Sequence, residues 1–159
     1  MKTLTDLIEQ KASCWCALDF ARLETLWDLS QPPVYFAEEA AAPSLSWDAL
    51  REYWRFTAGS IAKMHMVILR EPQYQPLADH LITGFYEMHW DALMCNHPKP
   101  IGGENRVCAT FRQTPEGWRF AQYVEAPLAP ITYMRRLYEQ CVTPGFADSQ
   151  SRSERPQGA

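Results

Sequence analysis

Residues 106–125 read RVCATFRQ-TPEG-WRFAQYVE, and this stretch decides the fold. Its outer segments, residues 106–113 and 118–125, alternate between side chains of different character, which indicates strands. The segment between them, Thr114-Pro115-Glu116-Gly117, has the composition of a tight turn. The stretch therefore predicts a β-hairpin at the end of a β-meander.

Segments upstream of the hairpin continue the meander. Residues 64–69 alternate with a period of two, and a second long strand is predicted at residues 81–94. Pro72 and Pro76 bound a turn region between these two strands. Residues 96–103 form a loop by their turn residues. We expect four consecutive antiparallel strands.

The first part of the chain carries helical signals. Thr3 followed by Asp6 resembles a capping box, and apolar residues then recur at helical spacing with one lysine, Lys11, among them. This pattern predicts a helix from about residue 5 to 18. Asp19 is placed to cap a second, shorter helix whose apolar residues keep the helical period in a new phase. The change of phase predicts a bend between the two helices.

A third helix is predicted after a short strand at residues 34–36. Ser46 has the character of an N-cap, and Gly59 helps to end the helix. One face of the helix collects Trp47, Leu50, Trp54, Thr57 and Ile61. This aromatic face must be buried.

The chain closes with one more helical pattern and a polar tail. Between Pro130 and Pro144 the apolar stripe consists of Ile131, Met134, Leu137, Tyr138 and Cys141. Residues 147–159 contain no aromatic or large aliphatic side chain. We expect one domain at residues 3–145, with the last helix added to it, and a disordered tail at residues 146–159.

Composition argues against several classes of function. The formal net charge is −4 and the basic residues are scattered, so no surface suited to nucleic acid or an anionic membrane is expected. No apolar run approaches the roughly 18 residues of a membrane-spanning helix, and Asp6 and Glu9 stand where a secretion signal would be apolar. Five cysteines without paired spacing are typical of buried thiols in a reducing compartment. We expect a cytoplasmic protein.

The order of elements, together with a few local motifs, resembles the nuclear-transport-factor-2-like superfamily, which includes ketosteroid isomerase, scytalone dehydratase and the SnoaL-like polyketide cyclases. The motifs are Ala17-Leu18-Asp19 and Leu26-Trp27, Ser46-Trp47 and Glu116-Gly117-Trp118. The resemblance covers about residues 3–127. It implies an α+β fold in which a strongly curved antiparallel sheet wraps three helices into a cone. It also implies an interior that binds small molecules and an outer sheet face that forms dimers.

Strand alternation assigns side chains to the two faces of this sheet. The pocket side is expected to hold Ile82, Tyr86, Met88, Trp90, Val107, Ala109, Phe111, Trp118, Phe120, Gln122 and Val124. The outer side is expected to hold Thr83, Glu87, His89, Asp91, Arg106, Thr110, Arg112, Arg119, Tyr123 and Glu125. A bulge or a register slip would exchange these sets. We expect a homodimer through the outer face, centred on Tyr123, Phe85, His89 and Thr110.

Few polar groups are expected in the pocket. Glu38 follows the first short strand, where the resemblance to ketosteroid isomerase implies a base, and burial would raise its pKa. Tyr53 and Tyr86 are the candidate proton donors. The candidate ligand-binding residues are Trp15, Trp54, Met66, Met88, Trp90 and Gln122. Residues 106–113 contain no Asp or Glu, so the second carboxyl of the ketosteroid isomerase motif is missing and that activity is not expected.

Two functions remain open from the sequence. The first is binding of a small apolar ligand without catalysis, or service as a dimeric association module. The second is acid–base catalysis, as in a dehydratase, isomerase or cyclase, on a small apolar substrate. His89 and Asp91 share a strand face, but no spacing supplies a third ligand, so neither a metal site nor a cofactor is expected.

Overall fold

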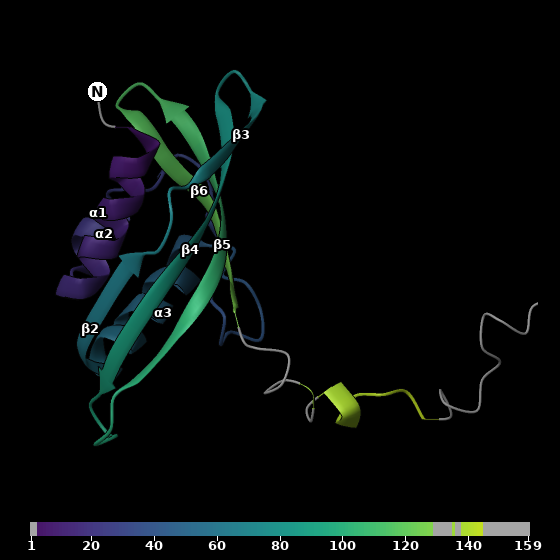
Figure 1. The fold of residues 1–159 in the computed structure, drawn as a ribbon. Helices are drawn as coiled ribbons and strands as arrows, with labels where there is room; N and C mark the ends of the chain where they lie inside the picture. The colour runs from purple at the N-terminus through teal and green to yellow at the C-terminus, as the bar shows by residue number, and fades with distance from the viewer. Residues whose placement is uncertain (1–2, 129–134, 136–137, 145–159) are drawn as a thin grey trace, which may run out of the picture. The chain divides into compact units, whose positions relative to one another are not determined.

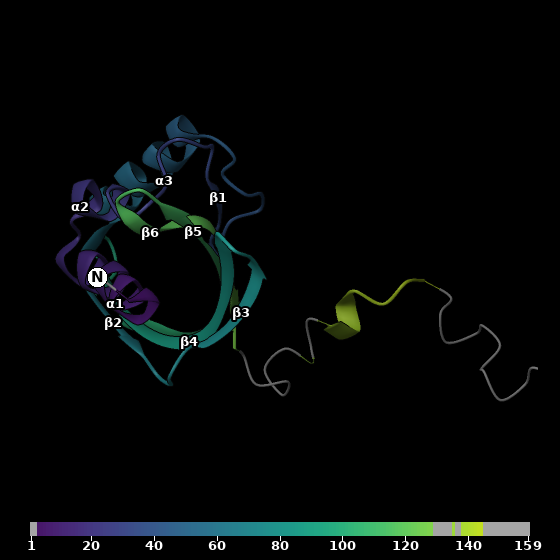
Figure 2. The same ribbon diagram turned by 90° about the horizontal axis from the view of Figure 1, so that it is seen from above.

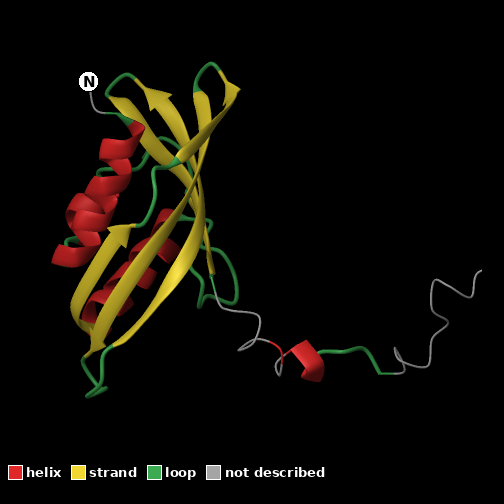
Figure 3. Ribbon diagram, in the orientation of Figure 1, coloured by secondary structure: helices red, strands yellow, loops and turns green. Residues whose placement is uncertain are grey.

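The computed structural model describes residues 3–128, 135 and 138–144. The chain divides into two compact units, Met1–Leu128 and Ala129–Ala159. The described part of the first unit has three helices, α1 (Leu4–Ala17), α2 (Phe20–Glu24) and α3 (Trp47–Ser60), and one sheet (Figures 1 and 3). This is the α+β composition that the sequence predicts.

Six strands form the sheet of this unit. They are β1 (Val34–Phe36), β2 (Ile61–Ile68), β3 (Gln73–Ala78), β4 (Leu81–Met94), β5 (Ile101–Thr114) and β6 (Gly117–Pro127). The order is β1-β6-β5-β4-β2, with β3 also paired to β4, and only β1 runs parallel to its neighbour. Seen from above, the strands curve round α1 (Figure 2). The expected strongly curved sheet is confirmed.

Local capping sets the bent pair of helices. The Thr3 hydroxyl accepts from the Asp6 amide at 3.1 Å, and the Asp6 carboxylate accepts from the Thr3 amide at 2.8 Å, which completes the predicted capping box. Leu18 ends α1 in the left-handed region, with φ 52°. Asp19 then caps α2 by accepting from the Arg22 amide at 2.9 Å. The two helices therefore form with the predicted break between them.

Three boundaries differ from the sequence prediction. A turn region was predicted between Pro72 and Pro76, but residues 73–78 form β3, and Pro76 is tolerated there because β3 pairs on one side only, with β4. Ile61 begins β2 instead of completing the face of α3, and Gly59 lies inside α3. β5 begins at Ile101, because its pairing with β4 continues through residues that have turn composition.

A bulge in β6 decides which side chains face inward. Thr110 pairs with Gln122, and Phe111 pairs with Phe120, so Ala121 is an extra residue in β6. Before the bulge the expected alternation holds, and Phe120 is fully buried. After it the alternation is reversed.

The reversal corrects the predicted faces of β6. Tyr123 has an exposed fraction of 0%, although it was expected at the centre of an outer-face dimer. Glu125 also faces inward, whereas Gln122 and Val124 are exposed. The predicted pocket-side placement of Gln122 is therefore wrong. On β4 and β5, where the pairing between the two strands contains no bulge, the predicted inward residues Tyr86, Met88, Val107, Ala109 and Phe111 are buried.

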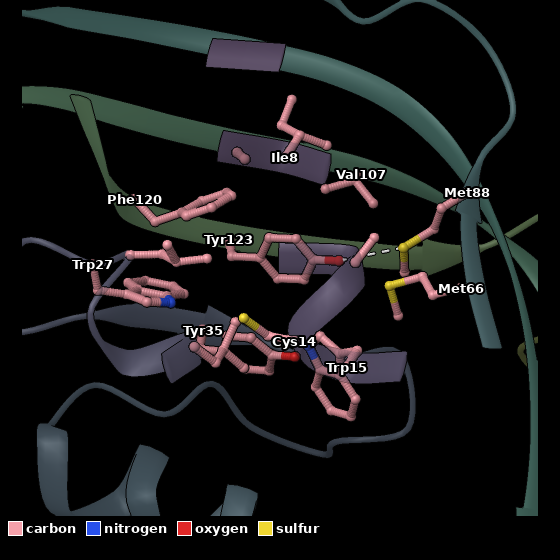
Figure 4. Packing of buried hydrophobic residues seen from close by; sticks show 14 of the residues in the cluster. Ile8, Cys14, Trp15, Trp27, Tyr35, Met66, Met88, Val107, Phe120 and Tyr123 are labelled. Carbon is pink, nitrogen blue, oxygen red and sulfur yellow. Dashed lines mark hydrogen bonds between the residues drawn. The ribbon is translucent and has the colours of Figure 1, made fainter. Parts of the chain in front are cut away.

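An aromatic cluster, defined as Trp27, Trp54, Phe111 and Phe120, fills one part of the interior. The Trp27 ring lies 5.6 Å from Phe120 and 6.4 Å from Trp54, and Phe120 lies 4.9 Å from Phe111, between ring centres. Figure 4 shows Trp27 and Phe120 packed beside Tyr123. Trp118, predicted on the pocket side, is half-buried and packs against the hydrophobic core. Rings from the helical region and from the sheet therefore fill this part of the interior.

The second unit is described only in part. Arg135 and residues 138–140 are helical, and Arg135 Nε lies 2.9 Å from Glu139 Oε1, one helical turn away. Ile131, Met134 and Leu137 of the predicted last helix lie outside the described residues, as does the predicted tail at residues 146–159. Within the described residues, no helix is long and apolar enough to cross a membrane.

Candidate functional site

A cavity of about 460 Å³ lies between the helices and the inner face of the sheet. Its walls are mostly apolar, and they are built from Trp15, Ile61, Met64, Met66, Met88, Trp90, Ala92 and Met94. Phe56 and Ile101 also line the cavity and are exposed, so they mark its mouth. Volume and lining are those of a small-molecule site.

The predicted ligand-binding residues divide into two groups. Trp15, Met66, Met88 and Trp90 lie in the cavity wall, and Figure 4 shows the side chains of the first three near one another. Trp54 is instead a buried member of the aromatic cluster, because its ring packs against Trp27 rather than facing the hollow.

Glu38 is placed in the cavity wall by the chain that leaves β1. Burial, together with the charges of Glu125 and Glu39, raises the pKa of its carboxyl to about 7, against a hydrogen bond from Asn105 that lowers it. A carboxyl with this pKa exchanges a proton readily near neutral pH.

The two predicted tyrosine donors differ in position. Tyr53, on α3, lines the cavity, and its hydroxyl donates to Glu39 Oε1 at 2.8 Å. Burial and the negative charge of Glu39 hold the pKa of Tyr53 well above its usual range. Tyr86 is buried in the core and is not among the residues that line the cavity.

Asn105, on β5, joins two carboxyls. One terminal atom of its amide lies 3.0 Å from the Glu104 carbonyl oxygen and 2.6 Å from Glu38 Oε2. A carbonyl oxygen only accepts, so this atom is the amide nitrogen, which donates to both. The other terminal atom, the amide oxygen, then faces Glu125 Oε2 at 3.3 Å. That contact is attractive when Glu125 carries a proton.

Glu125 is a site residue that the sequence did not reveal. It lies on β6 beyond the bulge, and its Oε2 accepts a hydrogen bond from the Tyr123 hydroxyl at 2.9 Å. That hydroxyl also lies 3.7 Å from Met88 Sδ (Figure 4). Burial raises the pKa of Glu125, while Lys11 and the hydrogen bond from the Tyr123 hydroxyl lower it. Strand alternation placed Glu125 outside because no residue type marks the bulge at Ala121.

Lys11 is the only lysine or arginine in the cavity wall among the described residues. Its Nζ lies 3.9 Å from the centre of the Tyr123 ring and 5.7 Å from that of Trp15. Burial lowers the pKa of Lys11 to about 8, although Glu125 and Cys14 act to raise it. The sequence signal was the single lysine in an otherwise apolar helical stripe.

The His89–Asp91 pair noted in the sequence does not line the cavity. His89 Nε2 is 3.2 Å from Asp91 Oδ1, and His65 Nδ1 is 3.5 Å from Asp91 Oδ2. Over the residues that the structure describes, no three His, Cys, Asp or Glu side chains are grouped to hold a metal ion.

Comparison with known sequences yields no match to a family model and none to a curated protein. Solved structures do match. A nuclear-transport-factor-2-like superfamily protein from Salmonella enterica is 14% identical, with a TM-score of 0.71 over 80% of this chain and 89% of that one. A putative scytalone dehydratase from Novosphingobium aromaticivorans is 6% identical, with a TM-score of 0.71 over 79% and 82%. A putative calcium/calmodulin-dependent protein kinase II association domain from Xanthomonas campestris is 11% identical, with a TM-score of 0.66 over 79% and 85%.

These likenesses show the fold. The chain has the nuclear-transport-factor-2-like fold, as the sequence resemblance implied. Proteins with this fold include ones named as enzymes and ones named as association domains. Because their identity to this chain is low, the likeness assigns neither role to it.

Proposed function

We propose that this chain binds a small, mostly apolar molecule in the cavity and transfers a proton on it, with Glu38 as the base. The observation that carries the proposal is the Glu38 carboxyl in an apolar cavity wall, with its pKa raised to about 7. A base of this pKa is partly ionised at neutral pH and still strong enough to remove a proton from an activated carbon.

Glu125 is the proposed acid that complements Glu38. The Asn105 amide presents its nitrogen to Glu38 and its oxygen to Glu125, so it favours an ionised Glu38 and a protonated Glu125. Two carboxyls with opposite protonation in one cavity supply an acceptor and a donor together. Tyr53 would then act by holding Glu39, because its hydroxyl is already donated to that carboxylate.

The reaction class that fits is lyase or isomerase chemistry without a cofactor. Glu38 would take a proton from a carbon next to a carbonyl group, and protonated Glu125 would donate a hydrogen bond or a proton to the oxygen that becomes negative. The walls formed by Met64, Met88 and Trp90 would exclude water and select an apolar body.

Solvent deuterium exchange tests the proposal directly. Cyclic ketones from cyclohexanone to 1-tetralone are incubated with the protein in deuterated buffer, and exchange at the α-carbon is followed by NMR. We expect catalysed exchange that rises with pH through about 7, as Glu38 loses its proton, and that falls by about a hundredfold in Glu38→Gln.

Glu116→Gln is the matched control, because it removes one carboxylate in the exposed hairpin turn, away from the cavity. Exchange in this variant should stay within a few fold of the wild type. Ketones that bind without catalysed exchange would show that the cavity binds its ligand without proton transfer. Exchange that survives in Glu38→Gln would show that Glu38 is not the base.

A second candidate function is self-association through the outer face of the sheet. Tyr123 is buried and therefore cannot form part of this interface. Phe85, Cys108 and Val124 lie directly across from one another on β4, β5 and β6. Phe85 is 45% exposed and Val124 is 37% exposed. An apolar row of this kind, flanked by polar Thr110 and Gln122, has the composition of an interface. The likeness to a protein named as an association domain supports it.

Sedimentation at micromolar concentration tests the association. Phe85→Glu should convert a wild-type dimer into a folded monomer, because it places a charge at the centre of a desolvated patch. Leu29→Glu, at an exposed apolar residue in the loop after α2, should leave the dimer intact. A monomeric wild type would exclude the dimer.

A further inference from the structure

Lys11 occupies a position on α1 where an apolar side chain is expected. It shares the buried face of the helix with Leu7, Ile8 and Trp15, and it is only 2% exposed. Burial of an ammonium group is costly unless the charge is paired. A lysine at this place therefore calls for a chemical explanation.

The surroundings of Nζ pair its charge only in part. Among the described residues, no carboxylate oxygen lies within 4.0 Å of Nζ. The contacts that it does make are with the faces of the Tyr123 and Trp15 rings, at 3.9 and 5.7 Å from the ring centres. Ring faces stabilise an ammonium group less than a carboxylate does. The environment therefore favours the neutral amine more than bulk water does.

The titration of Lys11 agrees with this geometry. Burial lowers its pKa to about 8, and the ionisable groups that act on it are Glu125 on β6 and Cys14 on α1, both of which raise it. A sizeable share of Lys11 is then a neutral amine at pH 7.5. A desolvated neutral lysine is a nucleophile toward carbonyl carbons.

The cavity also limits the class of ligand that Lys11 can meet. Glu38, Glu39 and Glu125 line the same cavity, so a ligand carboxylate would face three carboxyl groups and one lysine. A neutral carbonyl group on an apolar body meets no such repulsion. We propose that Lys11 captures an apolar aldehyde or ketone in this cavity as a reversible imine between its Nζ and the carbonyl carbon.

The step balances without an oxidant or a reductant. The lone pair of neutral Nζ attacks the carbonyl carbon, and the carbonyl π electrons move to oxygen, which gains a proton. The nitrogen loses a proton to an ionised carboxyl, and the oxygen leaves as water after a second protonation, which gives an iminium ion. Loss of the remaining N–H proton to the same carboxyl then gives the neutral imine. The products are the imine and one water molecule, no net proton is consumed, and Glu125 is the carboxyl in the cavity wall that can donate and take back these protons.

Reductive trapping tests the proposal on the full chain. The protein is incubated with 3-phenylpropanal and sodium cyanoborohydride at pH 7.5, and labelled peptides are identified by mass spectrometry. We expect Lys11 to be labelled at least about tenfold faster than the exposed Lys63 and Lys99, because an ordinary lysine is almost fully protonated at this pH. Equal labelling of the three lysines, or an unlabelled Lys11, would overturn the proposal.

Two variants and one further probe sharpen the test. Lys11→Met, which removes a buried charge and should fold, and Lys11→Arg should both lose the fast label. Binding of 3-phenylpropanoate that depends on Lys11, without labelling by the aldehyde, would mean that Lys11 anchors an anion instead, and it would sink the imine. The proposal uses the cavity but not proton transfer by Glu38. Lys11 should thus still be labelled in Glu38→Gln, even where deuterium exchange is lost.

Discussion

Two parts of one interior, the aromatic cluster and the cavity, are enclosed by the same sheet but filled differently. Around Trp27 and Phe120 the aromatic rings pack closely, with centre distances of 4.9 Å for Phe111–Phe120 and 5.6 Å for Trp27–Phe120. Around Glu38 the side chains from the strands are instead methionines and Ala92, and they line the open cavity.

The difference shows how this fold separates stability from binding. The rings of the aromatic cluster pack closely and leave no room for a ligand. Their burial contributes to the stability of the folded state. The cavity has carboxyl groups and a lysine in its wall, and these polar groups cannot be covered by apolar side chains without a large cost. The cavity is therefore the part of the interior where chemistry is possible, and the aromatic cluster stabilises the fold that encloses it.

The largest effect should follow from opening the aromatic cluster. Phe120→Ala removes a fully buried ring that contacts Trp27, Phe111 and Tyr123. We expect a loss of about 3–5 kcal/mol in the free energy of unfolding, because the surrounding rings cannot collapse into the space. Urea denaturation measures it. A loss below about 1 kcal/mol would mean that this part of the interior is not tightly packed.

The same kind of truncation at the cavity should cost less. Met64 is buried but borders the hollow, so its side chain already lacks packing partners on one side. We expect Met64→Ala to lower the free energy of unfolding by about 1–2 kcal/mol, below the usual range for a packed methionine. Denaturation under the conditions used for Phe120→Ala compares the two directly. A loss equal to that of Phe120→Ala would remove the distinction between cluster and cavity.

A smaller and pH-dependent effect is expected at Glu38. Its pKa is raised from 4.5 to about 7 in the folded state, so between these values the folded state binds more protons than the unfolded state. The contribution of Glu38 to stability is therefore present below pH 4.5 and is lost as pH rises through 7. Glu38→Gln lacks this loss, so its melting temperature relative to wild type should be higher at pH 8 than at pH 5. Partial exposure of the carboxyl reduces the size of the effect.

Glu116→Gln, in the exposed hairpin turn, controls for the removal of one carboxylate. If Glu38→Gln changes the melting temperature equally at pH 5 and pH 8, the carboxyl is not desolvated at the cavity wall.

Removal of the chain after Phe146 should have the smallest effect. The removed residues lack large apolar side chains, so they have little to offset the entropy of ordering them. We expect an unchanged melting temperature and unchanged ligand binding in the truncated protein. A clear drop in either would show that the tail contributes to one of the two regions.

Local chemistry in the sequence was enough to determine most elements of the fold. The Thr3–Asp6 capping box, the Asp19 cap and the Thr114–Gly117 turn each act within a few residues, so their consequences follow from the sequence alone. The period of two likewise predicted the inward faces of β4 and β5. The resemblance to ketosteroid isomerase, and not the periodicity, placed Glu38 as a candidate base, because the short strand before it was recognisable.

Only the tertiary structure decided the composition of the site. The extra residue Ala121 reverses β6, which brings Glu125 and Tyr123 inward and turns Gln122 out. Asn105 joins Glu38 to Glu125 only because β5 begins earlier than its turn residues suggest. A bulge and a strand start depend on pairing with distant strands, and no nearby residue records them. The sequence by itself therefore determined which elements form, and long-range pairing determined which of their side chains meet in the cavity.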